Sequence, residues 1–409
     1  MAHRKHHATF PVKLSVQRTW DVMADTQHLN QIFFGLDALH VVSRDGEKAR
    51  IRGSFGLFAP EYDEYPWVFE VPRHYKSVRV FTGGLLKRFV VECALNEDGS
   101  DTVVDYTLDV ETVGGPIGAI AAWVTVRRLK NGLDRARAFL AKLDDSGIPV
   151  WPPANPQREA VAQRAAALAG KIALADDDEK SALARLVEHV ADAPEPDVAR
   201  MRPYELADAW KIPRKKALTA CLQATRGGLL RLSWDLLCPS CEAPTSVDSL
   251  KSLPQGGHCP ACDIDFTTSF EQNVEATFSP EPAVRAAERL VFCHGSPSST
   301  KSWLAQFVVS PHAQHEISLQ LGTGRYRVQA AGIAGNTLMD VNDEASSSAH
   351  VRVGIEKLAG GDARLPAQVP EAKAGKVTVV VDNKDDVPRR VQLAHRALAS
   401  KAATAADVT

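Results

Sequence analysis

The sequence lacks any long hydrophobic run. No stretch of its 409 residues approaches the ~20 apolar residues that a helix needs to cross a bilayer. The first ten residues, MAHRKHHATF, also lack the apolar segment of a signal peptide. These absences predict a cytoplasmic protein without a membrane span. The formal net charge of −2 provides no overall attraction to nucleic acid or to an anionic surface, so any basic patch must be local.

Cysteine is scarce as well, with seven in the chain. In a cytoplasmic protein these are expected to be thiols or metal ligands rather than a disulfide framework. The segment CHGSPSS at residues 293–299 imitates a nucleophilic turn, but no GxSxG frame surrounds it. Since the sequence places no acid–base pair either, we expect that this chain alone is not an enzyme.

A chain of this length is expected to form several domains. Residues 1–146 begin with a short strand, continue with short helices opened by Ser15, and then alternate strand patterns with turns such as RDGE and NEDGS. A long helix from about Pro116 to Leu143 closes the region. Its predicted apolar face holds Ile117, Ile120, Val124, Leu133, Leu140 and Leu143, and its other face holds Arg127, Arg128, Lys130, Arg135 and Arg137. This order resembles the START-like (SRPBCC) helix-grip superfamily.

The START-like resemblance implies a cavity between the sheet and the long helix, binding a small apolar ligand. The residues expected to face this pocket are Trp20, Phe33, Phe34, Trp67, Phe89 and Trp123. An alternative interpretation is that these aromatic side chains simply fill the core, because a fold does not establish a ligand.

Residues 147–200 are predicted to form a proline-rich linker and a helical segment. Residues 201–237 follow the order of a winged helix: a short helix, a turn at Ile212–Pro213, a basic second helix and a strand. Such a module reads DNA in some proteins and contacts other proteins elsewhere. If it binds nucleic acid, the contacts are expected from Arg214, Lys215 and Lys216.

Residues 238–265 carry the strongest chemical signal, Cys238-x2-Cys241 followed by Cys259-x2-Cys262. Two such pairs present four soft sulfur ligands in the tetrahedral arrangement that Zn²⁺ prefers. An iron–sulfur cluster and a redox CxxC are alternatives. We predict a structural zinc ribbon, since four cysteines close the coordination shell that a catalytic zinc keeps open. His258 is expected outside that shell.

The remaining residues favour a β-sandwich over 266–395, because short strand patterns alternate with Gly, Pro and Asn turns. Residues 396–409 are predicted to be a tail that leads to a missing output domain. The expected fold class is therefore multidomain α+β: a START-like domain, a helical and winged-helix segment, a zinc ribbon and a sandwich.

Several segments resemble the N-terminal regulatory region of bacterial class III adenylate/guanylate cyclases. They include TWDVMADTQHLN (19–30), the stretch around both cysteine pairs, GRYRV (324–328) and VVVDNKDDVPRRVQL (379–393). The resemblance implies a non-catalytic sensor region for cyclic nucleotide signalling. Such a region positions a C-terminal cyclase domain, in the same polypeptide or in a partner chain, and it forms a homodimer. The cyclase catalytic domain itself is not present. The alternative is a ligand-responsive DNA-binding regulator that uses the winged helix and zinc ribbon.

Overall fold

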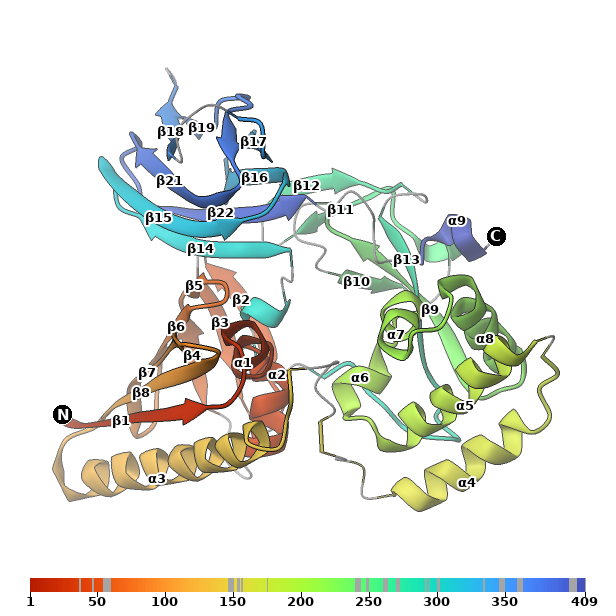
Figure 1. Ribbon diagram of the computed structural model, residues 1–409. Coiled ribbons are helices and arrows are strands. Elements are labelled where there is room, and N and C mark those ends of the chain that lie inside the picture. Colours follow the sequence, from red (N-terminus) through yellow and green to blue (C-terminus); the bar gives the residue numbers. More distant parts are fainter. Residues whose placement is uncertain are drawn as a thin grey trace.

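The computed structural model contains three parts (Figure 1): an N-terminal helix-grip region, a helical region and a β-sandwich. It describes residues 1–36, 38–45, 48–53, 60–145, 151–152, 155, 157–174, 176–239, 244–247, 250–259, 264–269, 273–290, 293, 295–299, 302–333, 335–345, 350–358, 363–396 and 403–408. Within these residues, no helix is both long and apolar enough to span a membrane. The mixed α+β class with large sheets is confirmed.

The N-terminal region has the predicted helix-grip order. Its elements are β1 (Ala2–Val12), α1 (Val16–Met23), α2 (Thr26–His28), the π-helical η1 (Leu29–Phe34), β2 (His40–Asp45), β3 (Lys48–Arg52), β4 (Glu61–Glu64), β5 (Val68–Glu70), β6 (His74–Phe81), β7 (Leu86–Asp98), β8 (Asp101–Thr112) and α3 (Gly115–Leu140). Ser15 caps α1 by accepting a hydrogen bond from the Arg18 amide. Antiparallel pairing gives the order β1-β8-β7-β6-β5, and α3 lies along this sheet.

The predicted apolar face of α3 is buried in its second half, at Leu133 and Leu140, but the first turns differ from the prediction. Small and apolar side chains, among them Ala122, Val126 and Ala136, are buried on α3, whereas Ile117, Ile120 and Val124 are exposed. The start of the helix is tightly packed: a Cβ added to Gly118 would lie 1.7 Å from the carbonyl oxygen of Val113, in the link from β8 to α3, and 3.2 Å from Thr112 Oγ1 at the end of β8. Only small residues fit at that contact, so the larger side chains of the first turns point outward.

A second close contact on α3 yields a stability prediction. A Cβ added to Gly132 would lie 2.2 Å from Cδ1 of the buried Phe34 ring. Gly132→Ala should therefore lower the free energy of unfolding by about 1–3 kcal/mol through overpacking, although alanine favours a helix. The matched control is Gly170→Ala after α4, where the nearest atom is the Ala166 carbonyl oxygen at 3.5 Å. Urea denaturation measures the free energy of unfolding of both variants, and equal stability of Gly132→Ala and Gly170→Ala would contradict the predicted clash.

The helical region contains α4 (Arg158–Ala169), α5 (Asp177–Asp192), α6 (Glu195–Ala199), α7 (Pro203–Trp210) and α8 (Arg214–Arg226). They pack on a three-stranded sheet of order β10-β9-β13, formed by β9 (Leu230–Leu237), β10 (Pro244–Val247) and β13 (Val274–Pro280). Asp176 caps α5 by accepting from the Glu179 amide. The chain between β10 and β13 carries η2 (Leu250–Ser252) and a hairpin of β11 (Gly256–Cys259) and β12 (Ile264–Thr267).

Two segments lie in the helical region although the sequence assigns them elsewhere. β13 falls in the range predicted for the sandwich, yet it pairs with β9 because Val274, Ala276 and Phe278 pack into the core of the helical region. The tail also returns to this sheet: the Ala276 amide donates to the Ala403 carbonyl over 2.7 Å, and α9 (Ala405–Val408) follows.

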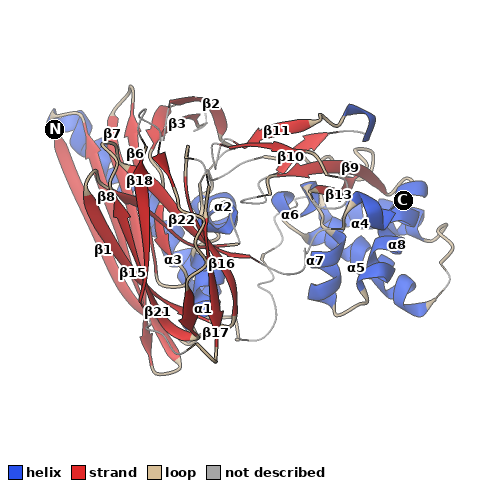
Figure 2. Ribbon diagram, turned by 90° about the horizontal axis from the view of Figure 1, so that it is seen from above, coloured by secondary structure: helices blue, strands red, loops and turns tan. Residues whose placement is uncertain are grey.

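The sandwich has two layers. One contains β14 (Trp303–Val309), β22 (Arg389–Arg396), β16 (Gly324–Ala330), β17 (Thr337–Asn342) and β20 (Glu371–Lys373), and the other contains β15 (Ala313–Leu321), β21 (Gly375–Asn383), β18 (His350–Lys357) and β19 (Ala363–Arg364). The short helix η3 (Pro297–Ser299) precedes β14. β14 also pairs with β5, through Glu70 with Ala305 and Phe69 with Gln306. The helix-grip sheet and one sandwich layer thus form a single 13-stranded sheet, opposite the helical region (Figure 2).

Candidate ligand site and interdomain contacts

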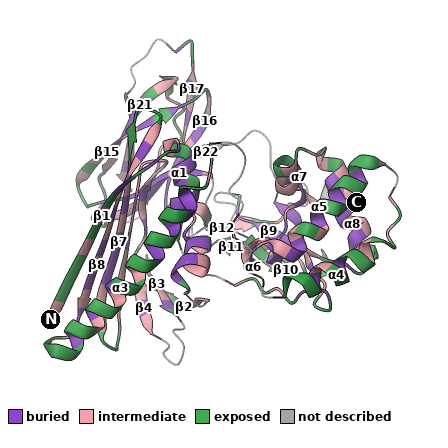
Figure 3. Cartoon of the chain, turned by 60° about the horizontal axis from the view of Figure 1, so that its bottom comes forward, coloured by how far each residue is buried: buried purple, intermediate pink, exposed green. Residues whose placement is uncertain are grey.

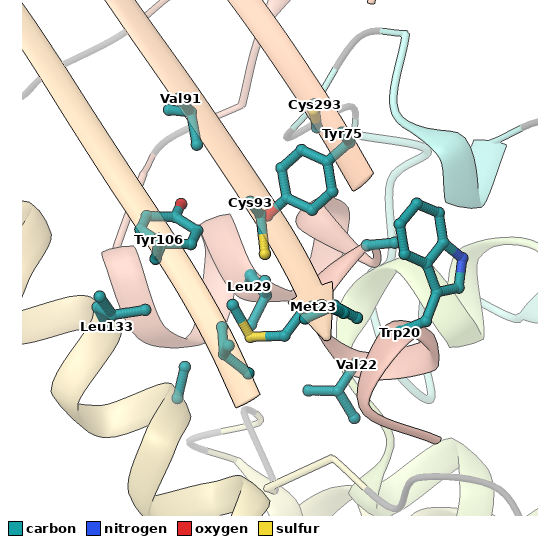
Figure 4. Close-up of a cluster of buried hydrophobic side chains, with 14 of the residues drawn as sticks. Trp20, Val22, Met23, Leu29, Tyr75, Val91, Cys93, Tyr106, Leu133 and Cys293 are labelled. Atoms are coloured by element: carbon teal, nitrogen blue, oxygen red, sulfur yellow. The ribbon is translucent and has the colours of Figure 1, made fainter. Parts of the chain in front are cut away.

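The inner face of the helix-grip sheet carries a row of polar side chains. Tyr75 on β6 pairs with Cys93 on β7, and Cys93 pairs with Tyr106 on β8, so one row crosses three strands. All three are buried and face Met23 and Leu29 from the short helices (Figure 4). Burial raises the pKa of the Cys93 thiol to about 12 and raises the pKa of both tyrosines above the usual range. The row is therefore neutral at physiological pH.

Two buried polar atoms around this row lack a hydrogen-bond partner among the described residues. They are the Ser77 hydroxyl, two residues further along β6 than Tyr75, and the indole N–H of Trp67. Leaving such a group unsatisfied in an apolar interior costs about 1–3 kcal/mol. The interior thus holds groups able to donate a hydrogen bond in a site closed to bulk water.

A buried ion pair lies further along the same face. Arg79 Nε donates to Glu64 Oε1 over 2.9 Å, and the Glu64 side chain is 1% exposed. The guanidinium carbon of Arg79 lies 5.7–5.9 Å from the ring centroids of Tyr62, Trp67 and Phe89. Burial on its own would lower the pKa of Arg79, but Glu64 outweighs it and holds that pKa above its ordinary value. The site therefore combines a fixed charge pair with aromatic walls.

The predicted pocket residues divide between this interior and the surface. Trp20, Phe33, Phe34, Trp67 and Phe89 belong to one buried core. The Trp20 and Trp67 rings contact Tyr75, with centroid distances of 6.1 and 5.6 Å. Trp123 is 44% exposed on the outer side of α3 and lies outside this interior. Ligand contact by the buried aromatics stays a prediction. The sequence reasoning missed Tyr75, Cys93 and Tyr106.

A second feature is a cleft of about 1200 Å³ between the short N-terminal helices and α5–α7. On its wall, His28 Nδ1 lies 2.7 Å from Asp25 Oδ2, and His28 Nε2 lies 3.0 Å from Asp197 Oδ1 on α6. The imidazole stacks on Trp151, with centroids 4.8 Å apart. Burial alone would lower the pKa of His28, but the two carboxylates outweigh it and raise the pKa to about 10. His28 therefore carries a positive charge that joins the two regions.

The segment leading to β14 also contacts the short N-terminal helices. Gln27 bridges this segment, since its Nε2 donates to the Leu290 carbonyl and its Oε1 accepts from the Cys293 amide, each over 2.9 Å. The Ser296 hydroxyl donates to the Ala24 carbonyl over 2.9 Å. The segment that links β13 of the helical region to β14 of the sandwich therefore contacts the helix-grip region.

The prediction of a structural zinc ion is wrong for the part of the chain that the structure describes. No group of three or more His, Cys, Asp or Glu side chains converges there in a way that holds a metal ion. Cys238 and Cys259 are buried, while Cys241 and Cys262 lie outside the described residues. Sequence spacing indicates which thiols are able to meet, whereas a metal site also requires several ligands to converge.

Two of the three cations predicted to contact nucleic acid are engaged within the protein. Arg214 Nη2 lies 2.8 Å from Asp208 Oδ2, and the Lys216 ammonium contacts both Asp176 and Glu179. Lys215 is exposed. Because these carboxylates neutralise the basic helix locally, the geometry does not favour phosphate binding there.

Comparison with known proteins adds the following. A family model described as a family of unknown function (DUF5939) matches residues 164–303. No curated protein matches the chain. The solved structures that match include a START superfamily protein from Mycobacterium smegmatis, with 15% identity over 34% of this chain and 98% of that chain and a TM-score of 0.25. They also include the ZhuI aromatase/cyclase from Streptomyces sp. R1128, with 16% identity over 34% of this chain and 94% of that chain and a TM-score of 0.27.

Proposed function

We propose that this chain is a non-catalytic regulatory region whose helix-grip domain binds a small, largely apolar molecule with one hydrogen-bond acceptor. The observation that carries the proposal is a pair of buried donors, the Ser77 hydroxyl and the Trp67 indole N–H, that have no hydrogen-bond partner among the described residues and lie beside the neutral Tyr75–Cys93–Tyr106 row. A ligand carbonyl or hydroxyl that accepts from them would recover the free energy that their burial costs. Aromatic walls suit a planar or polycyclic body.

The contacts between regions support a regulatory role for such binding. The short helices that cover the polar row also carry Asp25 and His28, and His28 reaches Asp197 of the helical region. A ligand that shifts these helices changes the His28–Asp197 contact. It biases the arrangement of the helical region if it binds one arrangement more tightly than another.

We further propose, on the sequence resemblance, that the regulated output is a class III adenylate/guanylate cyclase domain. The ligand-dependent cyclic nucleotide output of such a domain, fused after residue 409, tests this step.

Binding itself is tested with a fluorescent probe that has the proposed chemistry, 1-anilinonaphthalene-8-sulfonate, followed by displacement with aromatic ketones. Val91 is buried on β7 beside Cys93. Val91→Trp places a larger side chain where the proposed ligand would lie and is expected to weaken binding by at least ~tenfold, and Ser77→Ala by about fivefold through the lost donor. Tyr65→Phe, at an exposed tyrosine, is the control. Folding of each variant is checked by circular dichroism, and unchanged affinity in folded Val91→Trp would refute an interior site.

A further inference from the structure

The first turns of α3 present apolar side chains to solvent. Ile117 is 67% exposed, Ile120 62%, Val124 49% and Trp123 44%. All four belong to the first turns of α3, the end of the helix that lies at the edge of the molecule near the N-terminus (Figures 1 and 3). Isolated exposed apolar residues are ordinary, but several large ones at helical spacing mark an interaction surface.

Two neighbouring segments extend this surface. The Val113 amide donates to the Leu85 carbonyl over 2.9 Å, and the backbone nitrogen of Met1 lies 3.4 Å from the Cβ position of Gly114. The exposed side chains of Leu85 and Met1 therefore lie at the start of α3. We call Met1, Leu85, Ile117, Ile120, Trp123 and Val124 the α3 tip patch.

The charge beside the patch is positive although the whole chain is slightly acidic. α3 carries Arg127, Arg128 and Lys130 just after the patch, of which Arg128 donates to the Gly35 carbonyl and Lys130 pairs with Asp134. The Arg127 guanidinium carbon lies 5.1 Å from the Trp123 ring centroid, which places a cation directly at the apolar surface. β1 runs alongside α3 and adds the exposed Arg4, which is on the side of the strand that faces α3. Hydrophobic side chains, a tryptophan and flanking cations are the composition of a surface that lies on an anionic bilayer.

We propose that the α3 tip patch docks the protein peripherally on an anionic lipid bilayer. Its apolar side chains enter the headgroup boundary, and the cations contact lipid phosphates. A bilayer fits this surface better than a peptide does, because the patch lies at the exposed start of a helix at the edge of the molecule, whereas a helical peptide needs a groove. A second copy fits less well because it would bring the two basic helices and basic β1 strands together.

The test uses the 409-residue chain with vesicles of phosphatidylcholine alone and of phosphatidylcholine mixed with phosphatidylserine. Co-sedimentation is expected with the mixed vesicles at low salt and to weaken as salt rises. The double variant Ile120→Asp, Trp123→Ala should bind at least ~tenfold more weakly, and Arg127→Gln several-fold more weakly. The matched controls Val369→Asp, at a 51% exposed valine of the sandwich, and Lys215→Ala should bind like the parent.

Circular dichroism establishes that each variant is folded. No sedimentation with either vesicle type, or equal binding by the double variant and the Val369→Asp control, would overturn the proposal. Sedimentation velocity tests whether a second copy of the chain covers the patch instead. If the parent protein is a dimer that does not bind vesicles, and the double variant is a monomer, the patch serves self-association and lipid docking is refuted. Binding of the fluorescent probe tests the interior ligand site, and vesicle co-sedimentation tests the α3 tip patch, so failure of one proposal leaves the other unaffected.

Discussion

Replacing Asp235 by alanine is expected to lower the stability of the helical region by about 3–5 kcal/mol, since it removes the carboxylate of Arg289 and one of the two carboxylates that Arg200 contacts. Asp235 on β9 pairs directly with Glu275 on β13, and both side chains are fully buried. Arg200 lies 2.5 Å from Asp235 and 3.0 Å from Glu275. Arg289 lies 2.6 Å from Asp235, and Arg202 lies 2.7 Å from Glu275. Three cations thus hold two facing carboxylates inside the sheet.

The charge of Asp235 contributes favourably at neutral pH. Burial alone would raise the pKa of Asp235, but Arg200 and Arg289 outweigh burial and hold that pKa below its ordinary value. A carboxyl whose pKa is lower in the folded state stabilises the fold above its unfolded pKa of about 3.9 and loses that contribution as the pH falls through the folded pKa. The destabilisation by Asp235→Ala should therefore be complete at pH 7 and shrink in strong acid.

Hydrogen exchange of the β9 and β13 amides measures this change locally, which suits a chain of several regions. Asp235→Asn, which keeps the shape and part of the hydrogen bonding, should cost less than alanine. Asp208→Ala removes the half-exposed partner of Arg214 and should cost at most about 1 kcal/mol. If Asp235→Ala and Asp208→Ala lose equal protection, the buried cluster does not stabilise the sheet.

Local sequence patterns predicted the helices and strands of this fold better than they predicted which strands pair with each other. The strands of the helix-grip region, its closing helix and the two helices at 203–226 follow from periodicity and caps within each segment. The pairing of β5 with β14 joins segments more than 230 residues apart in sequence. Both strands are short, and their patterns carry no information on which edge each one meets. The same limit applies to β13, whose apolar alternation fits a sandwich and the helical region equally well.

The candidate site shows where a pattern is ambiguous and where it is informative. On β6, Val78 and Val80 suggest that their side of the strand faces the core, yet Tyr75 and Ser77 on the other side are the buried ones. Polar residues on the inner side of a strand are therefore the signal that sequence reasoning missed. On α3, the spacing of Ile117, Ile120 and Val124 correctly indicates one helical face, but periodicity does not reveal whether that face meets protein or solvent.

His28 provides the second large effect, and its sign depends on pH. Its folded pKa of about 10 exceeds the ordinary value of about 6.5, so ionised His28 stabilises the fold fully below pH ~6.5 and progressively less as the pH rises through the folded pKa. His28→Gln removes the charge that joins Asp25 to Asp197, and it should cost about 2–4 kcal/mol near pH 6, because both carboxylates lose their shared cation.

The measurement is the difference in unfolding free energy between the parent protein and His28→Gln at pH 6, 8 and 10, together with an NMR titration of the His28 ring. The difference is expected to shrink steadily toward pH 10, because the parent loses the charge that the variant never had. His312, an exposed histidine beside Asp386, provides the control: His312→Gln should leave stability nearly unchanged at every pH. A difference for His28→Gln that stays constant with pH, or a ring titrating near 6.5, would show that His28 holds the regions together by packing on Trp151 rather than by its charge.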